Sequence, residues 1–252
     1  MKEGTQNTNT NTNVKFNSAA YFSTPVWVAE APVFLKKMLK LTDGYLKTTE
    51  KKVMKKAIAE RDKKYGTKLG DLGLSNHSES FNADPKAKEF VDFCGQRSYE
   101  FLDWCGFNIS QHSLHFTECW VQEFAKKGGG HHDIHTHWNQ HVSGFYFLKC
   151  SEKTSYPIFH DPRPGSIMTK LPLKDDKKIT MGSSMINHKP KPGTMIIFPG
   201  YVPHEYAVDP GLEPFRFIHW NIKVVETAIS KERSNTNELS KKKILCYQRS
   251  CP

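Results

Sequence analysis

The chain has 252 residues, a formal net charge of +10, 37% hydrophobic and 12% aromatic residues, and six cysteines. This length fits one domain with short extensions, and the apolar content is sufficient for a hydrophobic core. The sequence contains neither a run of about eighteen apolar residues nor a signal-peptide pattern, so we expect no transmembrane helix and a cytoplasmic protein with reduced thiols.

The N-terminal part of the chain is predicted to be mainly helical. Residues 1–13 are a polar run rich in Asn and Thr, which is typical of a disordered tail. Residues 20–28 have the β-branched and aromatic character of a short strand. Residues 32–65 are rich in helix formers, and Gly44 is a candidate break between two helices. A further helix is predicted over residues 84–105, where an aspartate N-cap is followed by proline at the first helical position.

From residue 112 onward the pattern changes to short strands. Segments with β-branched and aromatic residues are separated by Gly, Pro and Asp turns. The predicted strands are 118–124, 142–149, 156–160, one within 179–186, 194–198 and 215–225. This pattern indicates a sandwich or barrel, and a jelly roll is the natural choice if its strands carry metal ligands.

We therefore expect one domain over residues 14–226. Its helical support would span 32–106 and its β core 112–226. Residues 227–252 would form a basic C-terminal tail outside the domain.

Histidines are concentrated in the β half of the chain. Nine of the twelve lie between His131 and His219. Histidine is the commonest protein ligand for a transition metal, and residues two apart on a strand point to the same side. His135 and His137 can therefore bind one ion from one strand, and His204 can complete the site from another. Two close ligands, one distant histidine and open coordination positions are typical of a non-haem Fe(II) oxygenase.

A second ligand set remains open in the same segment. His131, Asp133, His135 and His137 share one face of a regular strand, and His131-x-Asp133 with His204 would form a 2-His-1-carboxylate site. We favour His135-x-His137, because three glycines before His131 predict a turn there. The simpler alternative, a histidine-rich surface loop, does not account for the distant histidine and a downstream arginine together.

Arg216 opens a strand that is otherwise apolar. A guanidinium group in such a place needs an anionic partner. The carboxylate of a small acid would satisfy it through two parallel hydrogen bonds. A structural salt bridge is the alternative, and Arg216 by itself does not decide between them.

The positive charge is unevenly distributed. Residues 36–68 contain twelve Lys and Arg residues, and the C-terminus adds Lys241, Lys242 and Lys243. Such a surface can attract nucleic acid or another polyanion. A solvated helix face is the simpler interpretation, because the sequence contains no recognisable nucleic-acid-binding motif.

Taken in order, these motifs resemble those of a family of 2-oxoglutarate/Fe(II) oxygenases from marine bacteria and bacteriophages, related in fold to prolyl hydroxylases. The resemblance covers roughly residues 20–225. It is carried by Phe22-x-Thr24-Pro25-Val26-Trp27, His135-x-His137, Ser143-Gly144-Phe145-Tyr146-Phe147, Phe159-x-Asp161-Pro162-Arg163, Pro192-Gly193, Phe198-Pro199, His204, Arg216 and Asn221.

The resemblance implies a double-stranded β-helix with helices packed on one side. It implies Fe(II) bound by His135, His137 and His204, and 2-oxoglutarate bound through its 1-carboxylate and keto oxygen. Arg216 would hold the 5-carboxylate, and Tyr146 would hydrogen-bond to it. The implied reaction is hydroxylation of an unidentified substrate with decarboxylation of 2-oxoglutarate to succinate.

Two further details follow from the resemblance. Asp161 and Arg163 would fix a loop near the mouth of the site. Most relatives have a carboxylate as the second metal ligand, whereas our assignment places His137 there. A three-histidine site carries one more positive charge, which would weaken iron retention or alter oxygen activation.

Two other functions remain open at this point. One is a cupin-type metalloenzyme that does not use 2-oxoglutarate, and the other is a non-catalytic, metal-stabilised binding domain. A small molecule or a protein or peptide would be the substrate, with no membrane partner. Specificity is expected in the loops over residues 69–82 and 162–192, because such sites take their specificity from loops.

Overall fold

A computed structural model describes residues 22–165 and 171–227 of the chain. The predicted tail over residues 1–13 and nearly all of the predicted basic tail over 227–252 lie outside these residues. Within the described part, the strands are β1 (Trp27–Glu30), β2 (Ser75–His77), β3 (His112–Phe124), β4 (His132–His135), β5 (Val142–Lys149), β6 (Pro157–His160), β7 (Met185–Asn187), β8 (Thr194–Pro199), β9 (His204–Tyr206) and β10 (Arg216–Glu226).

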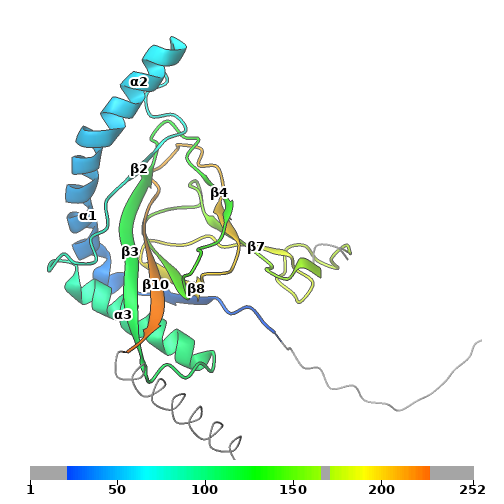
Figure 1. Cartoon of the computed structure of the whole chain (residues 1–252). Helices are drawn as coiled ribbons and strands as arrows, with labels where there is room; N and C mark the ends of the chain where they lie inside the picture. The colour runs from blue at the N-terminus through cyan, green and yellow to red at the C-terminus, as the bar shows by residue number, and fades with distance from the viewer. Residues whose placement is uncertain (1–21, 166–170, 228–252) are drawn as a thin grey trace, which may run out of the picture.

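The helices form one long rod and one shorter element (Figure 1). The rod comprises a 3-10 turn η1 (Pro32–Phe34), α1 (Leu35–Thr49), a π-helical segment η2 (Glu50–Met54) and α2 (Lys55–Tyr65), and the shorter element is α3 (Lys88–Trp104). The proposed break at Gly44 is wrong, because this glycine lies inside α1. One glycine costs a helix only about 1 kcal/mol, and burial of Met38 and Leu46 on the same helix outweighs that cost.

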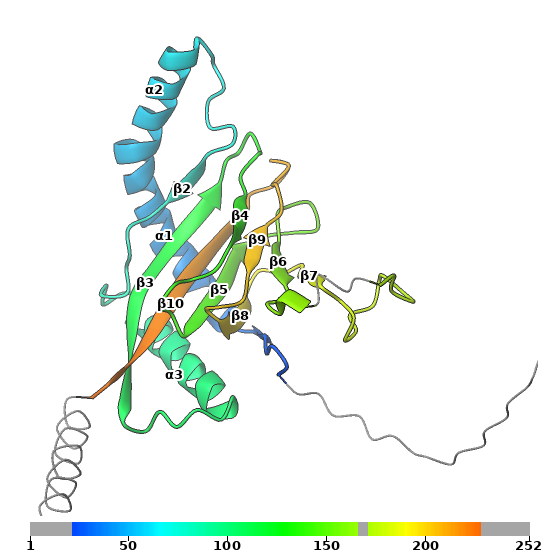
Figure 2. The same cartoon turned by 45° about the vertical axis from the view of Figure 1, so that its right-hand side comes forward.

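Two antiparallel sheets form the β core (Figure 2). The larger has the strand order β1-β8-β5-β10-β3-β2, and the smaller has β4-β9-β6-β7. From β3 to β10 the chain passes back and forth between the sheets, with β6 and β7 the one consecutive pair in the same sheet. This is the topology of a double-stranded β-helix, so the predicted mainly β fold with N-terminal helices is confirmed.

Alternate residues of the large sheet face two different cores. Tyr146 of β5 and Trp220 of β10 belong to the core shared with α1 and α3, which cover one face of this sheet (Figure 1). Phe145, next to Tyr146, and Phe217, three residues before Trp220, belong to an aromatic core on the opposite face. Gly144 allows this close packing, because a Cβ atom there would lie 2.1 Å from the Trp220 ring.

The strand boundaries differ from the predictions in three places. β3 begins at His112, six residues before the predicted start, and pairs along its length with β10. β1 begins only at Trp27, where pairing with Ile197 starts. The strand predicted within 179–186 is reduced to β7 (Met185–Asn187). In each case the partner strand sets the boundary, which local composition does not reveal.

Candidate iron site

Three of the predicted ligands come together at one end of the β core. His135 ends β4 and is paired in register with His204, the first residue of β9. His137 lies two residues beyond β4, where its backbone N–H donates to the Gly200 carbonyl at 2.9 Å. Its Nε2 atom is 3.3 Å from Nε2 of His204, and one nitrogen from each of the three rings lies within 4.8 Å of the others. This arrangement can hold one transition-metal ion.

Backbone carbonyl groups orient two of these rings. Nδ1 of His135 donates to the Asp133 carbonyl at 2.7 Å, and Nδ1 of His204 donates to the Val202 carbonyl at 3.0 Å. Because Nδ1 carries the proton, Nε2 keeps its lone pair for a metal ion. Burial also lowers the pKa of His204 to about 2 and that of His137 to about 3, so both rings are neutral near pH 7. The donor set therefore fits Fe(II).

The alternative ligand pair stays outside this cluster. The side chain of Asp133 is 96% exposed, and its carboxylate lies 3.6 Å from Nε2 of His131. The four-residue face predicted from a regular strand does not form, because the pairing of β4 with β9 is irregular between His132 and His135.

A polar network adjoins His137 on the inner face of the large sheet. Asn221 of β10 places Nδ2 2.9 Å from Nδ1 of His137, and the same Nδ2 donates a short hydrogen bond to Oε1 of Glu118. Ser143 donates to the Asn221 side-chain oxygen at 2.5 Å. Trp120 donates from Nε1 to Oε2 of Glu118 at 3.2 Å. Glu118 is therefore held in place by donors from two strands.

His219 completes this environment. It is 1% exposed, and neither ring nitrogen has a hydrogen-bond partner among the described residues. Its ring stacks on His137 with centroids 4.7 Å apart, and its Nε2 lies 3.7 Å from Oε1 of Glu118. The nearby His219 has the largest effect on the carboxyl group of Glu118 and helps lower its pKa to about 2.

The sequence analysis assigned no role to Glu118 or His219. The sequence did contain a signal for both residues. The predicted strands 118–124 and 215–225 contain Glu118, His219 and Asn221, and these two strands pair with each other in the structure. The period of two puts His219 and Asn221 on one face of β10. Only the tertiary structure, however, shows that His137 packs against this face of β10.

Arg216 is not brought to the histidines. Its side chain is 5% exposed and lies on the helix-covered face of the large sheet. Nε donates to Glu123 and Nη1 donates to Asp43, each at 2.7 Å, and Nη1 is also 3.3 Å from the Thr42 hydroxyl. The expected anionic partner exists, but it is supplied by the protein itself. The structure therefore supports the salt-bridge alternative over a role in binding 2-oxoglutarate.

Tyr146 also points away from the histidines. Its hydroxyl donates to the Ala31 carbonyl at 2.8 Å, and its ring packs against Phe90 of α3. Both corrections have one physical cause. Residues of even number on β5 and β10 face the helices in this part of the sheet, whereas Phe145 and His219 face the metal site.

The predicted loop contact is present. Arg163 forms a forked interaction with the Asp161 carboxylate, with Nε at 2.9 Å from Oδ1 and Nη2 at 2.6 Å from Oδ2. This pair fixes the chain immediately after β6. The predicted specificity loop over residues 162–192 continues from there, and residues 166–170 within it lie outside the described part.

A family model matches the segment that contains the three histidines. Residues 118–212 match the model described as "Putative 2OG-Fe(II) oxygenase". This segment resembles a 2OG-Fe(II) oxygenase, a family that uses Fe(II) and 2-oxoglutarate, and the resemblance found in the sequence is confirmed over these residues. The matched segment begins at Glu118 and ends before Arg216.

Several solved structures are similar to the chain at low identity. A prolyl-4-hydroxylase from Pseudomonas putida is 11% identical over 79% of this chain and 93% of its own, with a TM-score of 0.46. A viral collagen prolyl hydroxylase from Paramecium bursaria Chlorella virus-1 is 12% identical over 83% and 97%, with a TM-score of 0.46. An oxidoreductase of the 2OG-Fe(II) oxygenase family from Burkholderia pseudomallei is 13% identical, with a TM-score of 0.40. The similarity covers 56% of this chain and 59% of the length of that protein. None of the curated proteins matches the chain.

Two general expectations can also be compared with the described residues. None of their helices has both the length and the apolar character needed to cross a membrane. Their four cysteines, Cys94, Cys105, Cys119 and Cys150, are free thiols. Cys246 and Cys251 lie outside the described part.

The buried histidines predict a pH dependence of stability in metal-free protein. Burial lowers the pKa of His132 from 6.5 to about 4 and also lowers that of His219. Below pH 6.5 the unfolded chain therefore binds more protons than the folded chain, and the free energy of unfolding falls by up to about 1.4 kcal/mol per pH unit for each such group. Urea unfolding with a chelator at pH 7.5, 6.0 and 5.0 measures this slope. His132→Gln should reduce the slope of the free energy of unfolding against pH. His115→Gln, at an exposed position, should leave this slope unchanged. Equal slopes in the wild type and both variants would contradict the prediction.

Proposed function

We propose that this chain is a 2-oxoglutarate-dependent hydroxylase whose Fe(II) is held by His135, His137 and His204. The observation that carries the proposal is the convergence of one ring nitrogen from each of three histidines within 4.8 Å, inside the segment that matches the oxygenase family. Three protein ligands leave coordination positions open for cosubstrate and oxygen. Open positions favour this function over a non-catalytic, metal-stabilised domain.

When bound, iron and 2-oxoglutarate would activate dioxygen, so that one oxygen atom hydroxylates a C–H bond and the other is incorporated in succinate as 2-oxoglutarate loses CO2. The protein's contribution is to hold and enclose them. His204 and His135 have their tautomers set by backbone carbonyls, so both present Nε2 without rearrangement. The aromatic core behind them, which includes Phe145, Phe198 and Phe217, excludes water from the inner side of the site.

The group that binds the distal carboxylate of 2-oxoglutarate has to come from the inner face of the core. Tyr206 supports such a role, since it lies two residues after His204 on β9 and shares its face. Its hydroxyl is buried and has no hydrogen-bond partner among the described residues. We assign Tyr206 as the donor in place of Tyr146.

The proposed function is tested by anaerobic titration of the Fe(II)-loaded wild-type protein with 2-oxoglutarate. A weak visible charge-transfer band should appear and saturate. Admitting oxygen should then produce succinate, slowly in the absence of the substrate. A well-metallated protein that shows neither the band nor succinate would support a cupin-type enzyme without this cosubstrate.

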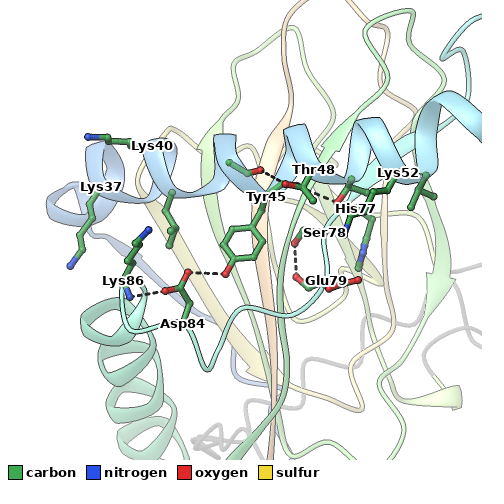
Figure 3. Close-up of a pocket in the computed structure, with 14 residues that line it drawn as sticks. Lys37, Lys40, Tyr45, Thr48, Lys52, His77, Ser78, Glu79, Asp84 and Lys86 are labelled. Carbon is green, nitrogen blue, oxygen red and sulfur yellow. Dashed lines mark hydrogen bonds between the residues drawn. The ribbon is translucent and has the colours of Figure 1, made fainter.

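The substrate is proposed to be a small molecule or a peptide, and the charge of the helices suggests that a polyanion also binds. A groove of about 820 Å3 lies between α1 and the segment that follows β2 (Figure 3). Lys37, Lys40, Lys52 and Lys86 line it, and Tyr45 donates across it to Asp84 at 2.8 Å. Among the described residues, no ion pair involves Lys40 or Lys52. Such lysines are available to contact the phosphate groups of a nucleic-acid backbone.

Binding of a fluorescent single-stranded oligonucleotide, followed by anisotropy at several salt concentrations, tests this part of the proposal. Reversing two charges with Lys40→Glu and Lys52→Glu should weaken binding by about tenfold and flatten its salt dependence. The matched control is Lys174→Glu with Lys177→Glu, two exposed positions in the loop between β6 and β7. Equal losses in the two double variants would indicate a nonspecific effect of net charge.

A further inference from the structure

The three histidines provide no negative charge to balance a bound Fe(II) ion, so we looked for acidic residues next to them. Neutral histidines leave the full double charge of Fe(II) uncompensated by His135, His137 and His204, whereas a site with one carboxylate ligand removes one unit of it. A cation enclosed by an aromatic core is costly unless a negative group lies close by. The nearest acidic groups are therefore informative.

Glu118 is the acidic residue in contact with the site. Its Oε1 accepts from Nδ2 of Asn221, which in turn is 2.9 Å from Nδ1 of His137. Its other oxygen accepts from Trp120 at 3.2 Å. The chain of contacts thus runs from a carboxylate to the ring nitrogen of His137 that does not face His204. Carboxylates in this outer position fix ligand orientation and raise ligand basicity.

A second metal ion is the competing interpretation of these residues. Glu118, His137 and His219 also place one ligand atom each within 4.8 Å of the others. The Asn221 amide nitrogen, however, already contacts both Glu118 and His137, so the space between these two is taken by a protein donor.

We propose that Glu118, whose carboxylate lies beside the iron ligand His137, supplies the negative charge that the ligand set itself lacks. The inference rests on the proposed function only for the metal site, since it concerns metal binding and not 2-oxoglutarate. It explains how His137 can occupy the position that a carboxylate ligand has in most relatives. The negative charge is supplied instead by Glu118 on β3, which lies next to the ligand His137 but does not bind the metal ion.

The proposal also gives His219 a role. A metal ion on Nε2 of His137 requires the proton on Nδ1, and a carboxylate close to this ring favours a proton on that side. His219, with Nε2 3.7 Å from Glu118 and no hydrogen-bond partner among the described residues, is a further nitrogen donor within reach of the carboxylate, beside Trp120 and Asn221.

The test is the affinity of the metal-free full-length protein for Co(II), an Fe(II) substitute with a visible spectrum. Glu118→Gln keeps the size and the hydrogen-bond acceptor but removes the charge, and should weaken Co(II) binding by about 10- to 100-fold. Asp133→Asn removes the same charge two residues before the ligand His135, but the Asp133 side chain is 96% exposed, so screening should limit its effect to about twofold. Unchanged affinity in Glu118→Gln would overturn the proposal, as would a large loss in Asp133→Asn, which would identify Asp133 as the ligand.

A double-mutant cycle separates charge from packing. His137→Asp places a carboxylate directly in the ligand set, so adding Glu118→Gln to it should cost less than about threefold. An equal loss in both backgrounds would assign Glu118 a packing role and overturn the proposal. If His137→Asp does not fold, as judged by circular dichroism, the comparison of Glu118→Gln with Asp133→Asn in otherwise wild-type protein still decides. Wild-type protein that binds Co(II) tightly but forms no succinate would contradict the proposed function alone.

Discussion

His204→Ala is expected to reduce Fe(II) or Co(II) affinity by more than about a hundredfold and to abolish succinate formation. The reason is geometric: His204 is 1% exposed, its Nδ1 is held by the Val202 carbonyl, and its Nε2 faces the other two ligands. Loss of a ligand should exceed the 10- to 100-fold effect typical of outer-sphere residues. Metal titration monitored by Co(II) absorption measures the affinity, and a coupled succinate assay measures turnover.

The control for this variant is His131→Ala. His131 lies in the same histidine-rich segment but outside the cluster of three, with its Nδ1 near the Gly129 carbonyl. It should keep wild-type affinity. Because a buried alanine also leaves a cavity, urea unfolding of both metal-free variants shows whether the fold persists. Wild-type Co(II) binding by a folded His204→Ala protein would contradict the assigned ligand set.

Arg216→Met is expected to lower the free energy of unfolding by about 3 kcal/mol while leaving the affinity of the folded protein for 2-oxoglutarate within about twofold of wild type. The buried guanidinium group pairs with Glu123 and Asp43 on the helix-covered face, so its removal leaves carboxylates without their partner. Lys149, 3.3 Å from Glu123, limits the loss by retaining one cation there. Urea unfolding gives the stability, and the anaerobic charge-transfer titration gives the cosubstrate affinity.

A matched control removes a cation from a surface ion pair. Lys189→Met breaks a 3.1 Å contact with Glu152, in which both side chains are about half exposed or more. An exposed pair contributes little, so stability should change by less than about 1 kcal/mol. If Arg216→Met instead lost 2-oxoglutarate binding at unchanged stability, the role implied by the family resemblance would stand.

The Arg216→Met experiment addresses the point at which the family resemblance and the structure diverge. The resemblance assigns Arg216 and Tyr146 to the cosubstrate, whereas both side chains lie on the helix-covered face. The family match itself covers residues 118–212 and stops before Arg216. The proposed ligands His135, His137 and His204 fall inside the match.

The amino-acid sequence by itself determined the fold class and the three histidines. Strand and helix composition is local, and the HxH spacing with a distant histidine is visible without any contact. Only the tertiary structure decided which side each strand presents. A β-strand places successive side chains on opposite faces, so an uncertainty of one residue in register moves Arg216, Tyr146, Glu118 and His219 between the metal site and the helix layer. Register depends on partners distant in sequence, which is the physical reason why the cluster of three histidines was predictable and its surroundings were not.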